Sequence, residues 1–573
     1  MDLGKIAKHM ISRLCICLFM INFTVSSIVF AEKSSPQEEI STKGLGHLSN
    51  HNHSSITAKT LADFTFDRTL LPASTDLSLN PAFPPIGDQG DYNSCVAWAT
   101  TYYTFTYMDH EEKGIASTYD NAYSPRWTYN MINGGLDYGS YIDDAIHVLE
   151  YQGALTMSDY PYLINNAYSF DWPHDTQAMI NALSTRAYND GELSIPSTYG
   201  SNFENSIDIV KFLLNNNTPC IVSAKATPLL TNGTWKMCEN SANYGESICV
   251  RNAKTYTSGI TITSEHSMTV VGYNDNIWCD VNGNNIQDAG ETGAFKIANS
   301  WGTTWKDMGY AWILYDSLLS TSRIKHSSYT SLPWDYFIDT NRDPFFACGG
   351  TTNDFCYFSV QDYTVGLVSE VTLITDRRNQ LSVSSLHPSG LYLADQFSVF
   401  SNYSNWNYNN SIGFNGTLVI NHPDSENIAT YLNGYSWGVR IHDTYFDNHA
   451  VYNVSCKIVD NLDNTIKTYC SNDYIDGTYH THSTSVNMNR GDVDYSDTLT
   501  LNDADIITDY LAHIRNLSNI QKILADYNND GFVDLTDVTA LKLDLANKGI
   551  DISSLDEKLD RYIQQGLIAY QNY

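Results

Sequence analysis

Basic residues are scarce in this chain of 573 residues. It has 32 Lys and Arg against 64 Asp and Glu, which gives a formal net charge of −32 at pH 7. A surface this acidic repels phosphate groups, so nucleic acids and anionic membranes are poor candidate partners. Apolar side chains are not lacking, because 42% of the residues are hydrophobic and 13% are aromatic, which excludes a wholly disordered chain. At roughly 100 to 200 residues per domain, the length predicts three or four folded domains.

Long apolar runs are absent after residue 30, so no later segment is predicted to span a membrane. Before that point, three basic residues within the first 13 precede an apolar stretch at 14–30, and the small residue Ala31 precedes polar sequence. This order of features predicts a secretory signal peptide over residues 1–31, and therefore secretion. An uncleaved membrane anchor is the alternative, because the apolar run is close to the length of a short transmembrane helix.

The rest of the chain contains three regions that differ in their pattern of residues. Residues 70–330 are rich in aromatics, with helical patterns followed by strand-like runs, which predicts an α+β domain. Residues 331–487 hold short alternating runs separated by Asn, Asp, Gly and Ser, which predicts a β-sandwich. Residues 488–573 hold two Asp-rich loops, each followed by a helical pattern, which predicts a small all-α domain. Helices are expected at 94–108, 142–152, 504–515 and 538–546, and strands at 219–224, 268–273, 294–298, 364–374, 416–420, 437–441 and 452–459.

Residues 32–69 are polar and contain few aromatics, so we predict a flexible segment between the signal peptide and the first domain. The segment contains His47, His51 and His53. A metal site is one interpretation of this group, but solvated linker histidines are the simpler one.

Cysteine usage points to at least one unpaired thiol. Cys15 and Cys17 lie in the predicted signal peptide, so nine of the 11 cysteines remain, which is an odd number. Cys95 is the candidate for the unpaired, reactive thiol. The others include three pairs that are close in sequence, which permits local disulfides without proving any: Cys238 with Cys249, Cys348 with Cys356, and Cys456 with Cys470.

Cys95 lies where a helix is expected to begin. A cysteine in the first turn of a helix has its thiolate favoured by the helix dipole and the free N–H groups. Gln89 can offer a side-chain N–H to an oxyanion beside the Cys95 backbone N–H. His266, at the start of an apolar strand, can act as the base, and Asn299 can hold its imidazole in one tautomer, shielded by Trp301. A buried structural cysteine would be the alternative for an isolated Cys.

The order of these four residues and their flanking sequences resembles the papain family of cysteine peptidases. The resemblance rests on the sequences PPIGDQG at 84–90, HSMTVVGY at 266–273 and NSWGTTWKDMGY at 299–310. It covers about residues 70–325. It implies a two-lobed α+β fold, with Cys95 in a helical lobe and His266 and Asn299 in a β-rich lobe.

The resemblance also implies endopeptidase activity. The Cys95 thiolate would attack a peptide carbonyl, His266 would protonate the leaving amine, and Gln89 would stabilise the oxyanion. The alternative is a catalytically silent papain-fold module used for binding or inhibition. The presence of all four residues argues against it, since a silent module has no use for the complete set.

The chain departs from the family pattern in two places. It reads YNSCV around Cys95 where the family has CGSCW, so the usual disulfide beside the nucleophile is missing. Only about 40 residues follow Ala31 before the first family-like positions, so the long propeptide helix is missing and latency through a large prodomain is not expected. Residues 133–135 and 139–140 lie where the family's glycine-rich cleft wall would be.

Residues 280–291 lengthen the gap between His266 and Asn299 relative to the family. Oxygen-bearing side chains stand at positions 1, 3, 5, 9 and 12 of this stretch, the spacing of a single-loop calcium site. A surface turn rich in Asn, Asp and Gly is the alternative, because position 6 is Asn285 rather than Gly. The candidate ligands are Asp280, Asn282, Asn284, Asp288 and Glu291.

The two C-terminal loops fit the same spacing better. In the second loop the candidate calcium ligands are Asp526, Asn528, Asp530, the Phe532 carbonyl, Asp534 and Asp537, and in the first they are Asp492, Asp494, Ser496, the Thr498 carbonyl, Thr500 and Asp503. The second has Gly531 at position 6, whereas the first has Asp497 there and should bind calcium more weakly.

Two loops that end in Asp, lie 34 residues apart and are each followed by one helix resemble the dockerin modules of cellulosome-type assemblies. The resemblance implies a calcium-dependent fold that docks to a cohesin module on a scaffold protein. The protein would then work in an extracellular complex, scaffold- or cell-surface-associated, on a protein or peptide substrate. An ordinary EF-hand pair is the alternative, but no helix is expected before either loop.

Overall fold

The computed structural model places the chain in detail over a set of ranges that excludes the predicted signal peptide, His51, His53 and Cys348. None of the helices within these ranges is long and apolar enough to cross a membrane. The described residues are 44–48, 56–163, 172–173, 175–226, 229, 235–239, 242–250, 265–324, 345–346, 352–378, 381–386, 392–395, 413–422, 436–443, 451–460, 465–471 and 481–568.

A buried helix begins at Cys95 and carries the first candidate residue. It runs as α2 (Cys95–Ala97), a wider π-type segment η4 (Trp98–Phe105) and α3 (Thr106–Lys113), and ends at Gly114 in the left-handed conformation (φ 66°). Every residue of η4 is buried. Burial on all sides is tolerated because its aromatic side chains are apolar and its threonine hydroxyls are hydrogen-bonded, Thr100 Oγ1 to Val96 O at 2.9 Å and Thr104 Oγ1 to Ala99 O at 2.8 Å. The predicted helix over 94–108 is therefore confirmed and extends further.

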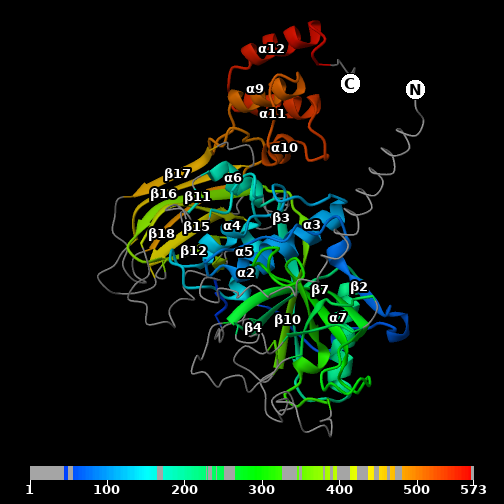
Figure 1. Ribbon diagram of the computed structural model, residues 1–573. Coiled ribbons are helices and arrows are strands. Elements are labelled where there is room, and N and C mark those ends of the chain that lie inside the picture. The colour runs from blue at the N-terminus through cyan, green and yellow to red at the C-terminus, as the bar shows by residue number, and fades with distance from the viewer. Residues whose placement is uncertain are drawn as a thin grey trace, which may run out of the picture. The chain divides into compact units, whose positions relative to one another are not determined.

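The neighbouring helices complete a helical half of this region. Helix α5 (Ile142–Gln152) has the predicted bounds. Helix α4 (Pro125–Ile132) begins with a proline, which is tolerated there because the first N–H of a helix has no hydrogen-bond acceptor within the helix. Figure 1 shows α2, α4 and α5 grouped together, with β4 and β7 to one side. Two further helices lie outside this group: α7 (Ser201–Asn215), which contacts strands of the sheet described next, and α6 (Thr176–Ala182). The short 3₁₀ turns of the region are η1 (Leu61–Asp63), η2 (Arg68–Leu70), η3 (Leu77–Leu79) and η7 (Tyr315–Leu318).

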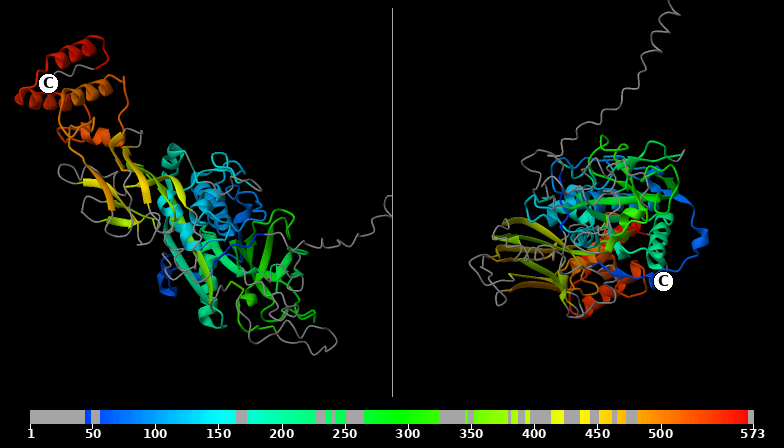
Figure 2. Two further views of the ribbon diagram at one scale, coloured as in Figure 1. Left: turned by 90° about the vertical axis from the view of Figure 1, so that its left-hand side faces the viewer. Right: turned by 60° about the horizontal axis from the view of Figure 1, so that its bottom comes forward.

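A ten-stranded sheet forms the other half, in the order β1-β3-β10-β4-β7-β8-β9-β6-β5, with β2 also paired to β7. Most of its strands, those from about residue 220 onward, appear in green beside the blue and cyan helices in both views of Figure 2. The three strands predicted at 219–224, 268–273 and 294–298 are present as β4, β7 and β8. The strands are β1 (Ala58–Lys59), β2 (Ser74–Asp76), β3 (Thr185–Pro196), β4 (Cys220–Lys225), β5 (Trp235–Met237), β6 (Ser247–Cys249), β7 (Glu265–Trp278), β8 (Thr292–Ala298), β9 (Tyr310–Leu314) and β10 (Thr352–Asp362).

Two sequence expectations about the edges of this region need correction. Strand β10 pairs with β3 and β4, so the chain beyond the predicted boundary at 330 still contributes to this sheet. Residues 56–69 are not a flexible segment, because β1 pairs with β3 and the η1 and η2 turns follow. Backbone pairing between distant segments is not visible in the composition of either one.

Two four-stranded sheets follow, in the orders β14-β11-β16-β17 and β13-β12-β15-β18. Buried side chains of both, such as Val371, Val383 and Trp437, belong to one hydrophobic cluster. All the strand pairs in them are antiparallel. The strands are β11 (Leu367–Thr375), β12 (Leu381–Leu386), β13 (Tyr392–Asp395), β14 (Phe414–Asn421), β15 (Ser436–Asp443), β16 (Val451–Asp460), β17 (Thr465–Ser471) and β18 (Thr481–Asn487).

The C-terminal part contains four helices in the described chain: α9 (Leu501–Leu511), α10 (Asn519–Ala525), α11 (Leu535–Asn547) and α12 (Ser553–Gln564). Helices α9 and α11 follow the two Asp-rich loops, as predicted. The expectation that no helix precedes either loop is wrong for the second, because α10 ends directly before Asp526. Ser518 caps α10 by accepting from Gln521 N, a local signal that the short apolar pattern does not reveal.

Candidate active site and metal-binding loops

Cys95 opens α2 and is completely buried. Burial raises the pKa of its thiol to about 11, although backbone N–H groups of Ser267, Gly46 and Val96 lie near the sulfur and pull the pKa down. Removal from water penalises the thiolate more than these dipoles stabilise it. In this conformation Cys95 is therefore a neutral thiol.

His266 is the second residue of β7, and its ring is held from two sides. Its Nε2 lies 2.7 Å from Asn299 Oδ1, and its ring centroid lies 4.4 Å from that of Trp301. Asn299 follows β8, the strand next to β7, so sheet pairing brings the two residues together. An amide oxygen accepts only from an N–H, so the proton of a neutral imidazole is on Nε2.

The second ring nitrogen of His266 is available for chemistry. Within the described chain, no atom makes a hydrogen bond to the buried His266 Nδ1. Burial also lowers the pKa of His266 to about 4; the Asn299 bond opposes this and the charge of His47 adds to it. A neutral imidazole with a free Nδ1 lone pair can accept a proton from a thiol.

Gln89 is completely buried, and both ends of its amide are engaged. Its Oε1 accepts from Ser300 Oγ at 2.6 Å, which fixes the orientation of the amide. Its Nε2 donates to the carbonyl oxygens of Tyr92 at 2.7 Å and Gly44 at 3.0 Å. The N–H predicted to serve an oxyanion thus already holds a carbonyl oxygen from the N-terminal segment.

That segment, residues 44–48, lies between the helical half and the sheet. His47 forms a parallel bridge with Ser140 and an antiparallel bridge with Glu265, the neighbour of His266. The backbone bonds are Gly44 N to Gly90 O at 3.1 Å, His47 N to Glu265 O at 3.2 Å, Leu48 N to Ser140 O at 2.9 Å and Ser140 N to Gly46 O at 2.7 Å. The segment therefore crosses the site at Ser140, within the predicted glycine-rich wall.

The expectations of a flexible segment and a solvated His47 are both wrong here. His47 Nδ1 lies 3.1 Å from Glu265 Oε2, and their side chains are 10% and 6% exposed. Sequence reasoning missed this contact because a short polar stretch carries no sign of a partner more than 200 residues away. The one available signal was the alternation Gly44-Leu45-Gly46.

Both glycines are needed for the segment to fit. A methyl group on Gly44 would lie 1.9 Å from the Tyr92 carbonyl oxygen, and one on Gly46 would lie 1.9 Å from the Asn93 carbonyl oxygen. Both obstacles are backbone atoms and cannot turn away as a side chain can. The local sequence is therefore matched to this path across Cys95.

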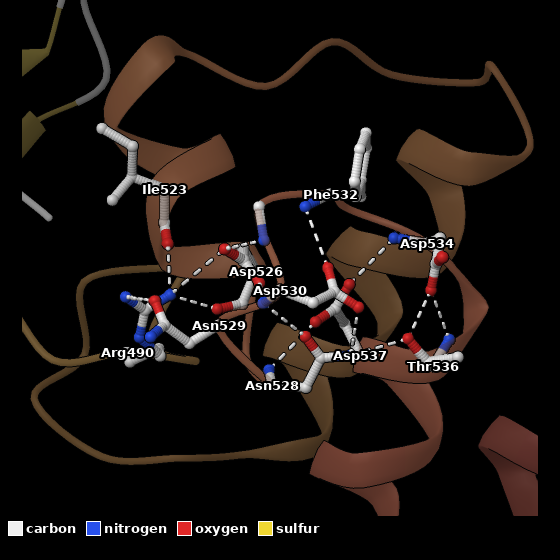
Figure 3. A network of polar contacts seen from close by, with 11 residues as sticks. Arg490, Ile523, Asp526, Asn528, Asn529, Asp530, Phe532, Asp534, Thr536 and Asp537 are labelled. Atoms are coloured by element: carbon white, nitrogen blue, oxygen red, sulfur yellow. Dashed lines mark hydrogen bonds and ion pairs between the residues drawn. The ribbon is translucent and has the colours of Figure 1, made fainter.

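In the second C-terminal loop Asp526, Asn528, Asp530 and Asp537 lie beside one another, whereas Asp534 is turned to Thr536, whose N and Oγ1 donate to it (Figure 3). Asp526 Oδ1 and Asn528 Oδ1 both accept from Asp530 N, at 3.0 and 2.9 Å. The two carboxylate oxygens of Asp537 accept from Asn528 N at 3.0 Å and Asp534 N at 2.8 Å. Arg490 lies beside the loop, with its guanidinium 3.6 Å from Asp526 Oδ2.

The first C-terminal loop repeats this pattern. Asp492 and Asp494 accept from Ser496 N at 2.9 and 3.1 Å, and Asp503 accepts from Asp494 N and Thr500 N at 3.0 and 2.8 Å. Ligand oxygens of the three aspartates all lie within 4.8 Å of one another. Burial raises the pKa of Asp492 to about 7 and that of Asp503 to about 6. Such converging, oxygen-only donors fit a hard divalent cation.

Residues 280–291 show the same hydrogen bonds at the same positions. Asp280 and Asn282 accept from Asn284 N, each at 3.1 Å, and Glu291 accepts from Asn282 N at 3.2 Å and Asp288 N at 3.0 Å. In all three loops positions 4 and 6 have positive φ; these residues are Gly283 and Asn285, Tyr495 and Asp497, and Asn529 and Gly531. Glycine at position 6 is thus not required for this backbone path.

Comparison with known proteins identifies the region that contains Cys95, His266 and Asn299. Residues 71–332 match the family model of papain family cysteine proteases. Solved structures that match include xylellain, a cysteine protease from Xylella fastidiosa, with 18% identity over 55% of this chain and 96% of that chain and a TM-score of 0.34. Procathepsin B S9 from Trypanosoma congolense matches with 15% identity over 56% and 87% of the two chains and a TM-score of 0.33. No curated protein matches. Residues 71–332, which carry Cys95, His266 and Asn299, are a papain-family cysteine peptidase domain.

Proposed function

We propose that the protein is a secreted cysteine endopeptidase that cleaves peptide bonds with Cys95, His266, Asn299 and Gln89. Cys95 is the nucleophile and gives its proton to His266 Nδ1, and His266 then protonates the leaving amine. Asn299 holds the imidazole with Nδ1 toward the thiol. Gln89 Nε2 stabilises the oxyanion of the tetrahedral intermediate.

One observation carries this proposal more than any other. The 2.7 Å contact from His266 Nε2 to Asn299 Oδ1 fixes the tautomer and leaves a buried Nδ1 with no hydrogen bond in the described chain. A buried ring nitrogen without a partner is costly in a purely structural site. It is useful where the nitrogen must accept a proton during a reaction. A catalytically silent papain fold, the alternative, would gain nothing from this arrangement.

The segment over residues 44–48 keeps this peptidase latent until it is displaced or cut. It supplies a carbonyl oxygen to Gln89 Nε2 and an N–H to the Cys95 sulfur, the two places where a reacting carbonyl would bind. Burial beneath it also favours the neutral thiol and the neutral imidazole, so the nucleophile is not activated while the segment stays.

The C-terminal part is proposed to be a dockerin that binds a cohesin module of a scaffold protein and needs calcium to fold. Two loops with the same hydrogen-bond pattern support this, as do the buried carboxylates Asp492 and Asp503, whose oxygens lie within 4.8 Å of each other and of Asp494. Bound calcium would supply positive charge between these acids. The two four-stranded sheets are proposed to be a β-sandwich spacer between peptidase and dockerin.

Hydrolysis of an unstructured protein such as casein tests the enzymatic proposal. The chain should cleave it after segment 44–48 has been removed by limited proteolysis, and Cys95→Ala should reduce the rate to background. Cys456→Ala, which removes a buried cysteine from β16, is the matched control and should retain full activity. Equal rates for Cys95→Ala and the unaltered chain would favour the silent module.

A pull-down with a cohesin-bearing scaffold tests the docking proposal separately. Binding should require calcium and should disappear when a chelator is added, while peptidase activity persists. Scaffold binding that survives chelation, or activity lost together with binding, would contradict the division of labour proposed here.

A further inference from the structure

Cys238 and Cys279 each follow a strand directly. Cys238 comes after β5 and Cys279 after β7, and both side chains are buried as free thiols. They belong to the same hydrophobic cluster, which also contains Ile248 and Val250 of the β6 region. Two cysteines 41 positions apart in sequence therefore share one small part of the core.

One backbone hydrogen bond brings the chain beside Cys238 against the chain beside Cys279. Glu239 N donates to Trp278 O at 2.8 Å. Cys238 precedes this donor and Cys279 follows this acceptor, so each cysteine is one residue away from the bond.

This closeness suits a covalent bridge, because disulfides join Cα atoms that are about 4.4 to 6.8 Å apart. Both cysteines also pack in the same small hydrophobic cluster, so their side chains occupy the same part of the core.

The partner that sequence proximity suggested for Cys238 does not fit. Cys249 lies on β6 between Ile248 and Val250, which belong to the cluster of Cys238, whereas Cys249 belongs to a different cluster. Successive side chains of a strand point to opposite faces, so Cys249 faces away from Cys238. Closeness along the chain therefore misleads here.

We propose that Cys238 and Cys279 form a disulfide when the chain folds in the presence of a low-molecular-weight or protein disulfide. The two protein thiols lose two protons and two electrons, and one S–S bond forms between them. The oxidant's S–S bond breaks, and it leaves as two thiols. This bond is distinct from the proposed catalysis and does not involve Cys95.

Burial decides when this exchange takes place. Both side chains are buried in the folded protein, so an oxidant in solution does not reach either thiol. The bond therefore forms before the cluster closes. Once formed, it is sheltered from reducing thiols by the same packing.

The bridge would anchor the loop over residues 280–291 at its base. Cys279 N donates to Glu291 O at 3.1 Å, and Lys236 Nζ donates to the carbonyl oxygens of Asp280 and Val281 at 3.0 and 2.9 Å. The two ends of the loop and the β5 strand thus meet at the proposed bond. Fixing this junction holds the loop's oxygens in place whether or not a cation binds.

Peptide mapping of the full chain tests the proposal directly. The chain is refolded with reduced and oxidised glutathione, its free thiols are blocked with iodoacetamide under denaturing conditions, and its digest is analysed by mass spectrometry. We expect the peptides of Cys238 and Cys279 to be linked, lighter than their sum by two hydrogen atoms, with Cys249 alkylated. Alkylation of both Cys238 and Cys279, or a link from Cys238 to Cys249, would overturn the proposal.

Thermal unfolding supplies a second measurement. A loop of this size should raise the Tm of the peptidase domain by roughly 5 to 15 °C when it is closed by a disulfide. The unaltered chain and Cys249→Ser should therefore have a Tm lower by that amount when they are refolded in reductant than when they are refolded with glutathione. For Cys279→Ser the two refolding conditions should give a much smaller difference, and an equal difference in that variant would contradict the bond.

Discussion

The carbonyl oxygen of Gly44 accepts a 3.0 Å hydrogen bond from Gln89 Nε2. Through this contact the N-terminal segment occupies the donor that the proposed reaction needs. Because the same segment covers Cys95, displacement of residues 44–48 and exposure of the nucleophile are a single event.

Gly46→Ala should therefore activate the enzyme. The added methyl group would overlap the Asn93 carbonyl, and forced overlap of this kind costs about 1 to 3 kcal/mol, so the uncut chain should become on the order of tenfold or more active. Initial rates of casein cleavage measure this. Gly200→Ala is the control, since nothing lies near an added methyl group there. An unchanged rate for Gly46→Ala would mean that the segment does not limit activity.

Lower pH should favour displacement of residues 44–48 from the site. His266 has a pKa near 4 beneath it and an ordinary value of 6.5, so the displaced state binds more protons than the closed state between these two values. The equilibrium between the closed and displaced states therefore favours the closed state most strongly above pH 6.5. Its equilibrium constant shifts toward the displaced state by up to about a hundredfold as the pH falls to 4. His47 and Glu265, which pair beside His266, are the other ionisable groups at this contact.

High pH should also favour displacement of residues 44–48. The Cys95 thiol has a pKa of about 11 in the closed state against 9.0 ordinarily, so the displaced state loses its proton first as the pH rises. A synthetic peptide of residues 41–50, added to protein lacking that segment, should inhibit most strongly between about pH 6.5 and 9. Inhibition that strengthens steadily toward pH 4 would contradict this account.

Asn299→Ala should reduce kcat while leaving the fold intact. Loss of one hydrogen bond to a buried imidazole costs about 1 to 3 kcal/mol, which corresponds to a fall of roughly 5- to 150-fold. The variant should also shift the pH dependence of kcat/KM, because the Asn299 bond raises the pKa of His266. Asn216→Ala, at the exposed end of α7, is the control. A normal rate and pH profile in Asn299→Ala would remove Asn299 from the proposed mechanism.

Three calcium ions should bind per chain if residues 280–291 work as the two C-terminal loops are proposed to. Glu291→Gln removes one carboxylate charge that accepts from Asn282 N and Asp288 N, and it should abolish one binding event in a calorimetric titration. Asp551→Asn, an exposed residue before α12, should leave all three. A titration with two events in both proteins would show that the loop is a surface turn only.

The sequence by itself indicated the candidate chemistry-bearing residues and determined most local structure. The flanks of Cys95, His266 and Asn299 are local motifs, and α5 has the predicted bounds because its apolar residues recur with the helical period. The spacing of oxygens in the three loops could also be read directly, since each loop is a contiguous stretch.

Only the tertiary structure decided which distant segments meet. Backbone hydrogen bonds between segments far apart in sequence determine the path of residues 44–48 over Cys95, the return of β10 to the first sheet, and the closeness of Cys238 and Cys279. Backbone hydrogen bonds are nearly independent of side-chain identity, so no residue pattern announces them. The same pairing buries Cys95 and His266 beneath residues 44–48. This burial favours the neutral thiol and the neutral imidazole, which are the inactive forms in the proposed mechanism.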